Sequence, residues 1–344
     1  MLGKRYDVLE LLGKGGMGAV YRAHDRLTGQ QVALKRVERT ADGISTTAPT
    51  EDNELRTALA QEFRVLASLR HPNIVSVLDY GFDELRLPYF TMELLEGARH
   101  IDSAARERPE GDQVDLMMQM LQALVYLHRH GILHRDLKPS NVLVIGNTVK
   151  VLDFGLALFE NTEDTALGTL PYMAPELLYG HRADERADLY AVGLVIYEIL
   201  VGTHPFEDEN RQQLLNNILS KHPDLRPLDT SYRPILHRLL QKDPNYRYRS
   251  ATEVINALMK SRHLAVPRES AATRESFLQA ARMIDREEER ERLTDQVRAD
   301  HRPDGREHAL LRNRTEFRLE HSGDLAGLAI DHAHEERIGA VIER

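Results

Sequence analysis

Short segments near the start of the chain alternate apolar and polar residues. These segments lie at 6–13, 19–25, 31–38, 74–80 and 87–92. Such alternation is typical of half-buried β-strands, and the Thr28-Gly29 pair suits a turn between two of them. The first part of the chain is therefore predicted to form a small sheet.

A helical spacing of apolar residues interrupts this pattern after a polar stretch at 40–54, which is predicted to be a mobile loop. The helical positions are Leu59, Phe63, Leu66 and Leu69. They recur every three or four residues, and His71-Pro72 ends the run. One helix is therefore predicted inside the strand-rich region.

From about residue 112 the pattern becomes mainly helical. The segments QVDLMMQMLQALVYLHRHG (113–131) and DLYAVGLVIYEILVG (188–202) are the clearest cases. The first is apolar nearly all round, which is typical of a buried helix.

The predicted fold class is therefore α+β, with two lobes. The smaller, β-rich lobe with its one main helix covers about 6–93, and the larger, mostly α-helical lobe covers about 97–262. Beyond about residue 265 charged residues dominate. Residues 263–344 are predicted to form a charged extension, helical and partly disordered.

Composition limits the classes of function. The 344 residues carry a net charge of −9, which argues against nonspecific binding to nucleic acid or anionic membrane. Cysteine is absent, so a disulfide framework, a thiolate nucleophile and a zinc-cysteine site are excluded. The first residues lack the apolar core of a secretion signal, and the apolar stretch 190–201 is too short to span a bilayer. We expect a cytoplasmic protein without a membrane span.

The stretch LLGKGGMGAV at 11–20 matches G-x-G-x-x-G at Gly13, Gly15 and Gly18. Alone, it fits a dinucleotide-binding turn, a nucleotide-gripping hairpin or a flexible loop. A strand-like segment follows rather than a helix, and G-x-x-x-x-G-K-[ST] does not occur in the chain, so the hairpin is favoured. Lys35 in VALK then suits contact with ATP phosphates, although a lone strand lysine is more often simply solvated.

Further motifs follow in order: HRDLKPSN at 134–141, DFG at 153–155 and APE at 174–176. Together with the glycine loop and VALK, they closely resemble the protein kinases from residue 6 to about 262. The resemblance implies the bilobal kinase fold, binding of ATP, and Mg²⁺ as the metal, with Mn²⁺ as an alternative.

The resemblance also implies chemical roles. Asp136 would accept the proton of a substrate hydroxyl or orient that hydroxyl, and Lys138 would lie near the γ-phosphate. Asn141 and Asp153 would hold the metal through hard oxygen ligands. Each of these residues alone would be an ordinary loop or turn residue, so the assignments depend on the motif.

Lys35 needs a carboxylate partner to hold its geometry. Glu62, on the helix that precedes Pro72, is the best candidate, and Gln61 and Glu54 compete weakly. If Glu62 does not pair with Lys35, it is an ordinary solvated carboxylate on the helix.

A nucleotide pocket follows from the same resemblance. Its residues would be Leu12, Gly13, Gly15, Gly18, Val20, Ala33, Lys35, Met92, Glu93, Leu95 and Leu143. Val20, Ala33 and Leu143 would sandwich the adenine, while backbone groups of Glu93 and Leu95 would bond to its edge. Apolar residues at these positions would equally suit ordinary core packing.

Two features indicate a serine/threonine kinase rather than a tyrosine kinase: Lys138 and the segment GTLPYMAPE at 168–176. The resemblance further implies a buried ion pair between Glu176 and Arg247. It also implies that Asp188 braces the backbone of the catalytic loop.

Regulation through the segment 156–167 is a further prediction. Thr162 and Thr165 are its hydroxyls, and a phosphate on either could pair with Arg135 and order the segment. We favour autophosphorylation at one of the two. The segment is already acidic, so constitutive activity and unmodified threonines are the alternatives.

The opening LGKGGMGAVYRAHD most resembles the bacterial eukaryotic-like serine/threonine kinases. Residues 276–297 faintly resemble the start of AAA-like NTPase modules. No phosphate-binding loop follows them, so a charged, solvated helix is the preferred interpretation of the tail.

The predicted function is Mg-ATP-dependent phosphorylation of serine and threonine hydroxyls on protein substrates. A pseudokinase or scaffold that binds a partner through its tail is the alternative, but the catalytic set is complete. A small-molecule kinase is disfavoured by the peptide-holding segment 168–176. The oligomeric state is left open, with a dimer as one option.

Overall fold

The computed structural model describes residues 5–15, 18–37, 66–84, 87–154, 170–208 and 210–262. The chain divides into two units, Met1–Arg282 and Met283–Arg344, and every described residue belongs to the first unit. The following predictions fall outside the described residues: the loop at 40–54, Glu62, Thr162, Thr165 and the extension 263–344. They stay predictions.

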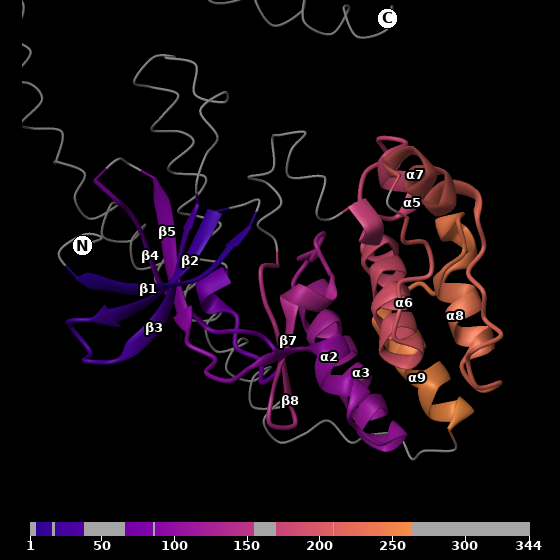
Figure 1. The fold of residues 1–344 in the computed structure, drawn as a ribbon, viewed down its shortest axis with the longest axis horizontal. Coiled ribbons are helices and arrows are strands. Elements are labelled where there is room, and N and C mark those ends of the chain that lie inside the picture. Colours follow the sequence, from indigo (N-terminus) through magenta and orange to yellow (C-terminus); the bar gives the residue numbers. More distant parts are fainter. Residues whose placement is uncertain are drawn as a thin grey trace, which may run out of the picture. The chain divides into compact units, whose positions relative to one another are not determined.

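Five antiparallel strands form the sheet of the first lobe in the described part of the chain (Figure 1). In spatial order they are β1 (Tyr6–Gly15), β2 (Gly18–Asp25), β3 (Gln31–Val37), β5 (Pro88–Glu93) and β4 (Val77–Phe82). The predicted glycine hairpin is confirmed, because Gly15 faces Gly18 across β1 and β2. Gly18 has a φ of 132°, a conformation that favours glycine.

Alternate residues of β3 belong to two different apolar clusters. Val32 and Leu34 pack with Tyr6 in a small cluster, whereas Ala33 belongs to the main core. Side chains alternate between the two faces of a strand, so Lys35 shares a face with Ala33. The strand period therefore directs the lysine toward the main core.

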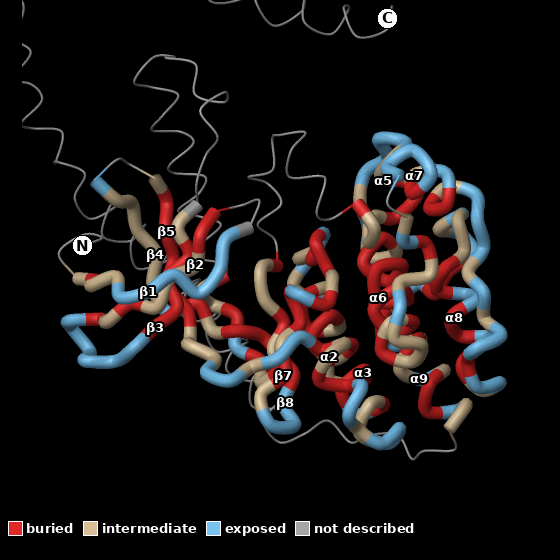
Figure 2. Tube along the Cα trace, viewed as in Figure 1, coloured by how far each residue is buried: buried red, intermediate tan, exposed pale blue. Residues whose placement is uncertain are grey.

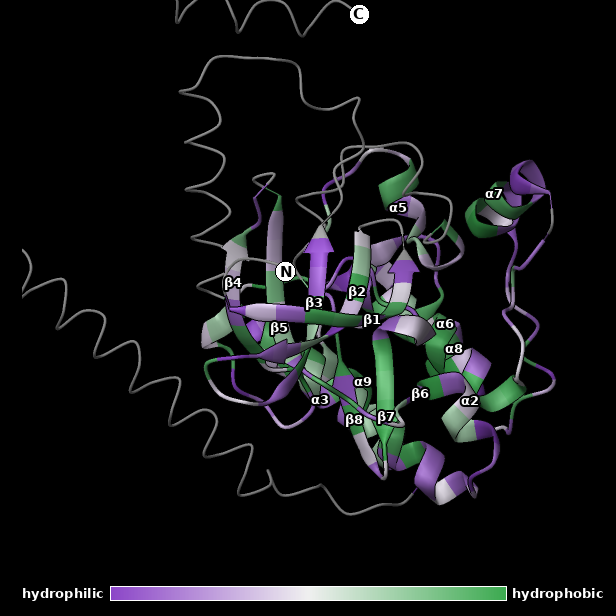
Figure 3. Ribbon diagram, turned by 60° about the vertical axis from the view of Figure 1, so that its left-hand side comes forward, coloured by the Kyte–Doolittle hydropathy of each residue, from purple (hydrophilic) through white to green (hydrophobic). Residues whose placement is uncertain are grey.

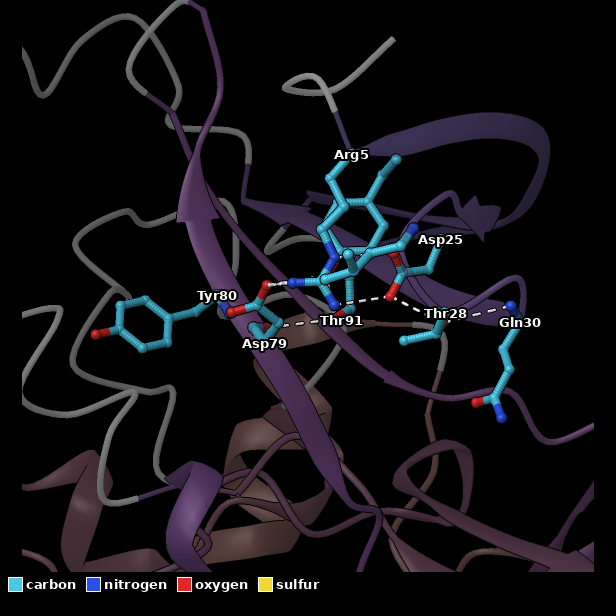
Figure 4. A network of polar contacts seen from close by, with 9 residues as sticks. Arg5, Asp25, Thr28, Gln30, Asp79, Tyr80 and Thr91 are labelled. Atoms are coloured by element: carbon cyan, nitrogen blue, oxygen red, sulfur yellow. Dashed lines mark hydrogen bonds and ion pairs between the residues drawn. The ribbon is translucent and has the colours of Figure 1, made fainter.

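A polar network fastens the start of β1 to β2 and β4 (Figure 4). Arg5 donates hydrogen bonds to both carboxylate oxygens of Asp25, at 2.8 and 2.7 Å, and also contacts Asp79. The Tyr6 hydroxyl donates to Asp79 at 3.0 Å. The Arg5 guanidinium holds the pKa of the Asp25 carboxyl well below its usual range.

The second lobe contains a small sheet of short strands that were not predicted from the sequence. Its strands are β6 (Arg99–His100), β7 (Val142–Ile145) and β8 (Thr148–Val151). Segments of two to four residues are too short for a periodic pattern to stand out. The Gly146-Asn147 pair between β7 and β8 was the available signal, because such pairs favour tight hairpin turns.

Helices make up most of the rest of this lobe (Figure 1). The α-helices are α2 (Ile101–Arg106), α3 (Glu110–Arg129), α5 (Pro175–Leu178), α6 (Glu185–Val201), α7 (Arg211–Ser220), α8 (Arg233–Leu239) and α9 (Ala251–Ser261). Three 3₁₀ turns accompany them: η2 (Pro139–Asn141), η4 (Leu170–Tyr172) and η5 (Pro244–Tyr246). None of the described helices is long and apolar enough to cross a lipid bilayer.

Helices α3 and α6 supply many of the buried residues of the main core, and Figure 2 shows buried stretches in both. The predicted buried helix at 113–131 is confirmed. Helix α6 begins where the Asp184 side chain accepts a hydrogen bond from the Arg186 N–H, and it ends at Gly202 with a φ of 88°. Figure 3 shows β7 as hydrophobic along its length, and alternate residues of this strand are buried.

Candidate active site

The segment between α3 and β7 holds three of the predicted catalytic residues together. Lys138 Nζ donates to the Asp136 carboxylate at 2.9 Å. Asn141 Nδ2 donates to the backbone carbonyl and to the carboxylate of Asp136, each at 2.8 Å. Pro139 starts the turn η2, which brings Asn141 back beside Asp136. Asp136 is 5% exposed, and these bonds hold its carboxylate in a fixed orientation.

Asp188 on α6 braces the backbone of this segment, as predicted. Its carboxylate accepts backbone hydrogen bonds from His134 at 2.8 Å and Arg135 at 2.9 Å, and a side-chain bond from His128 Nε2 at 2.8 Å. Burial alone would raise the pKa of Asp188, but the hydrogen bond from His128 and the backbone bond from His134 keep its pKa below the ordinary value. The brace is therefore a charged carboxylate.

Lys35 and Asp153 form an ion pair. Lys35 Nζ lies 2.6 Å from Asp153 Oδ2, and Lys35 is 5% exposed. Asp153 has a φ of 56°, which is uncommon for a residue with a side chain. The predicted partner of Lys35, Glu62, lies outside the described residues, so that pairing remains a prediction.

Asn141 and Asp153 fit the ligand set of a hard divalent ion. The Leu152 N–H donates to the Asn141 carbonyl at 2.9 Å, which joins the two segments. Asp153 Oδ1 is buried and has no hydrogen-bond partner, so it can accept a metal. The described residues hold no cluster of three or more His, Cys, Asp or Glu side chains suited to a metal. An ion here would complete its shell with water and phosphate oxygens, which suits Mg²⁺.

Three predicted residues of the base pocket lie on adjacent strands. Ala33 faces Met92 across β3 and β5, and both are buried. Val20 on β2 faces Lys35 and is half-buried against the main core. Leu143 is half-buried on β7 and comes from the second lobe.

The remaining predicted residues differ in what they can offer a ligand. The Glu93 N–H already donates to the Ser76 carbonyl at 3.1 Å, so a base could reach only the Glu93 carbonyl. Leu95 is half-buried in the linker between the lobes. Leu12 and Gly13 are exposed on β1, and a side chain at Gly13 would meet no atom within 4 Å. Packing within the protein therefore does not require a glycine there.

The predicted ion pair between Glu176 and Arg247 is confirmed. The guanidinium donates to both carboxylate oxygens of Glu176 at 2.7 Å, and Arg247 is 1% exposed. Its remaining N–H groups donate to the backbone carbonyls of Gln241, Arg186 and Lys242. The pair is fully hydrogen-bonded, as a buried charge must be.

Three contacts of this region were not predicted from the sequence. They are Lys35 with Asp153, His128 with Asp188, and the Glu93 side chain with Lys150. The partners in each pair lie far apart along the chain, and no local spacing marks them.

The comparisons with known proteins agree with this geometry. A family model described as the protein kinase domain matches residues 6–259. A probable serine/threonine-protein kinase of Streptomyces coelicolor is 35% identical over 271 residues, which cover 74% of this chain and 39% of the relative. The DNA damage-responsive serine/threonine-protein kinase RqkA of Deinococcus radiodurans is 38% identical, over 70% of this chain and 36% of the relative.

A third relative, the serine/threonine-protein kinase PrkC of Bacillus subtilis, is 32% identical over 73% of this chain and 39% of its own length. The chain thus spans less than two fifths of each of these three relatives.

The fold and the site together define a bilobal α+β protein kinase. The chain belongs to the protein kinase domain family, and its relatives place it with the serine/threonine-protein kinases of the eukaryotic-like bacterial type. Membership of this family implies the use of ATP and of a divalent metal ion.

Proposed function

We propose that this chain transfers the γ-phosphoryl group of Mg-ATP to serine and threonine hydroxyls of protein substrates. The supporting observation is that Lys138 and Asn141 both donate hydrogen bonds to the Asp136 carboxylate, within 2.9 Å. The ion pair of Lys35 and Asp153 completes the set. Phosphoryl transfer depends mainly on positioning and on neutralising charge, and this set supplies both.

Asp136 would orient the attacking hydroxyl and take its proton. A carboxylate can accept several hydrogen bonds, and the bonds from Lys138 and Asn141 fix the orientation of this one. Lys138 would also stabilise negative charge on the transferred group. The cationic side chain of Lys35 would hold the α- and β-phosphates.

Asn141 and Asp153 would hold the divalent ion, which neutralises phosphate charge when bound. We propose Mg²⁺, with Mn²⁺ as the alternative, because oxygen ligands and few protein groups suit a strongly hydrated ion. Val20, Ala33, Met92 and Leu143 would enclose the base, and Leu12, Gly15 and Gly18 would cover the phosphates. A cytoplasmic location, where ATP is abundant, is part of this proposal.

Regulation by autophosphorylation at Thr162 or Thr165 is also proposed. Arg135 is exposed beside the catalytic aspartate, where its charge could meet a phosphate. Pairing of Lys35 with Glu62, a partner for the extension 263–344 and a dimeric state stay proposals from the sequence.

A transfer assay tests the proposed function. Purified protein is incubated with γ-labelled ATP, Mg²⁺ and a generic basic acceptor protein, beside Asp136→Asn and the control Asp115→Asn, which changes an exposed aspartate on α3. We expect Asp136→Asn to lower incorporation by about 10²–10⁴-fold, the usual contribution of a positioned base, and Asp115→Asn to leave it unchanged.

Equal incorporation by wild type and Asp136→Asn would refute the role of Asp136. Binding of Mg-ATP by the wild type without any transfer would favour the scaffold instead. Label mapped to Thr162 or Thr165 would support autophosphorylation.

A further inference from the structure

The Glu93 side chain makes contacts that base binding does not use. Its Oε1 accepts a hydrogen bond from Lys150 Nζ at 2.7 Å and another from the Ser76 N–H at 2.9 Å. The Glu93 N–H returns a bond to the Ser76 carbonyl at 3.1 Å. The Glu93 side chain is 31% exposed and that of Lys150 is 16% exposed, so water screens this pair less than it screens a pair on the open surface.

Ser76 belongs to a loop that is itself bonded to β8. The Val75 N–H donates to the Val151 carbonyl at 3.0 Å, and the Val151 N–H donates to the Asn73 carbonyl at 2.9 Å. The loop is therefore bonded both to the end of β5 and to β8. Lys150, also on β8, joins the same two strands directly.

The joined strands carry the two ends of the proposed nucleotide site. Glu93 begins the segment whose backbone would contact the base, and β8 ends two residues before Asp153, the proposed metal ligand. A bound nucleotide would contact the base-binding segment with its base and, through the metal ion, Asp153 with its phosphates. A fixed spacing between them lowers the ordering cost of binding, which is the general effect of pre-organisation.

We infer that Glu93 and Lys150 form a clasp that holds the base-binding segment in place relative to the metal-binding segment and so raises the affinity for Mg-ATP. Both are positioning residues, because Lys150 acts through its bond to Glu93, and Glu93 acts through its bonds to Lys150 and Ser76. This inference rests on the proposed function, since it concerns the same site.

The test compares Lys150→Met with two controls. Lys150→Met removes the cation, and we expect the Kd for Mg-ATP and the KM for ATP to rise about tenfold, the loss of one charge-assisted hydrogen bond. The kcat should change by less than about twofold, because the clasp does not contact the reacting groups. Lys150→Arg should restore near-normal affinity. Arg226→Met breaks an exposed ion pair with Asp224, also of 2.7 Å, and should have no effect.

A second variant tests the coupling and guards against misfolding of the first. Glu93→Gln weakens the acceptor, and we expect the Kd to rise in the single variant. The double variant with Lys150→Met should bind no more weakly than Lys150→Met alone, because the two residues act through one bond.

An unchanged Kd in Lys150→Met would overturn the clasp, and so would a rise in kcat at constant Kd, because the contact would then restrain the enzyme. Failure of the proposed function is a separate outcome. A wild type that binds Mg-ATP without transferring phosphate would refute the proposed transfer. The clasp would still be tested in that case, because the Kd values of the variants do not depend on transfer.

Discussion

At the scale of single residues, backbone strain is concentrated at the proposed active site. Among the described residues, Arg135 and Asp153 are the non-glycine residues with positive φ, at 65° and 56°. Such conformations cost free energy and persist where neighbouring contacts hold them. Asp188 accepts the Arg135 N–H, and Lys35 holds the Asp153 carboxylate. Arg135, the neighbour of Asp136, and Asp153, the proposed metal ligand, are therefore held by contacts rather than by local preference.

His71 gives the protein a pH-dependent stability. It is 6% exposed, and its Nδ1 accepts a hydrogen bond from the Asn73 N–H at 3.1 Å. Burial first, and then the charge of Lys150, lower its pKa to about 4. Between about pH 4 and 6.5 the unfolded chain therefore binds a proton at this residue that the folded chain does not. The contribution of neutral, buried His71 to the free energy of unfolding is therefore fully present above the unfolded pKa of about 6.5. It is lost as the pH falls toward the folded pKa of about 4.

We expect His71→Asn to reduce this dependence. Asparagine can still accept from the Asn73 N–H but does not titrate, so the slope of the unfolding free energy between pH 4.5 and 6 should fall by about 1 kcal/mol per pH unit. Urea denaturation at several pH values measures the slope. The exposed His222→Asn should keep the wild-type slope, and the same slope in His71→Asn would contradict the assignment.

At the scale of elements, Gly193 sets the approach of α6 to the segment that ends α8. A Cβ atom at Gly193 would lie 2.8 Å from Leu240 Cδ2 and 2.9 Å from Leu239 Cβ. No ordinary Cβ contact is that short, so the neighbouring backbone or side chains would have to move. The glycine is therefore required by packing, although it weakens the helix by itself.

We expect Gly193→Ala to destabilise the fold by about 1–3 kcal/mol through overpacking, despite the better helix propensity of alanine. Gly111→Ala is the matched control, because no atom lies within 4 Å of a side chain at that helical position. The control should be neutral or slightly stabilising in chemical denaturation. Destabilisation of both variants to the same extent would show that packing against Leu239 is not the cause.

Prediction from the sequence succeeded where a pattern is long or a motif fixes the geometry. The glycine hairpin and α3 follow from strand and helix periods, and Asp188 and Glu176 occupy the contacts that the motifs imply. The short strands β6 to β8 carry too little pattern to be found by period. The direct contact of Lys35 with Asp153 was missed because tertiary structure, rather than spacing, brings these residues together.

At the scale of the whole molecule, the proposed site takes residues from both lobes. Lys35 comes from the sheet of the first lobe, whereas Asp136, Asn141 and Asp153 come from the second. Loss of contacts between the lobes should therefore affect nucleotide binding before it affects the orientation of Asp136. The Glu93–Lys150 clasp is proposed to act at this level.

The two parts of the proposed site have different roles. Asp153 and Asn141 bind the metal ion that accompanies the nucleotide, whereas Asp136 orients the substrate hydroxyl and takes its proton. Calorimetric titration of Mg-ATP into the wild type, Asp153→Asn and Asp136→Asn tests these roles most directly. We expect Asp153→Asn to weaken binding at least about tenfold and to remove its dependence on Mg²⁺. Asp136→Asn should bind within about twofold of the wild type, because its proposed partner is the hydroxyl. Wild-type affinity in Asp153→Asn, or lost binding in Asp136→Asn, would contradict the account.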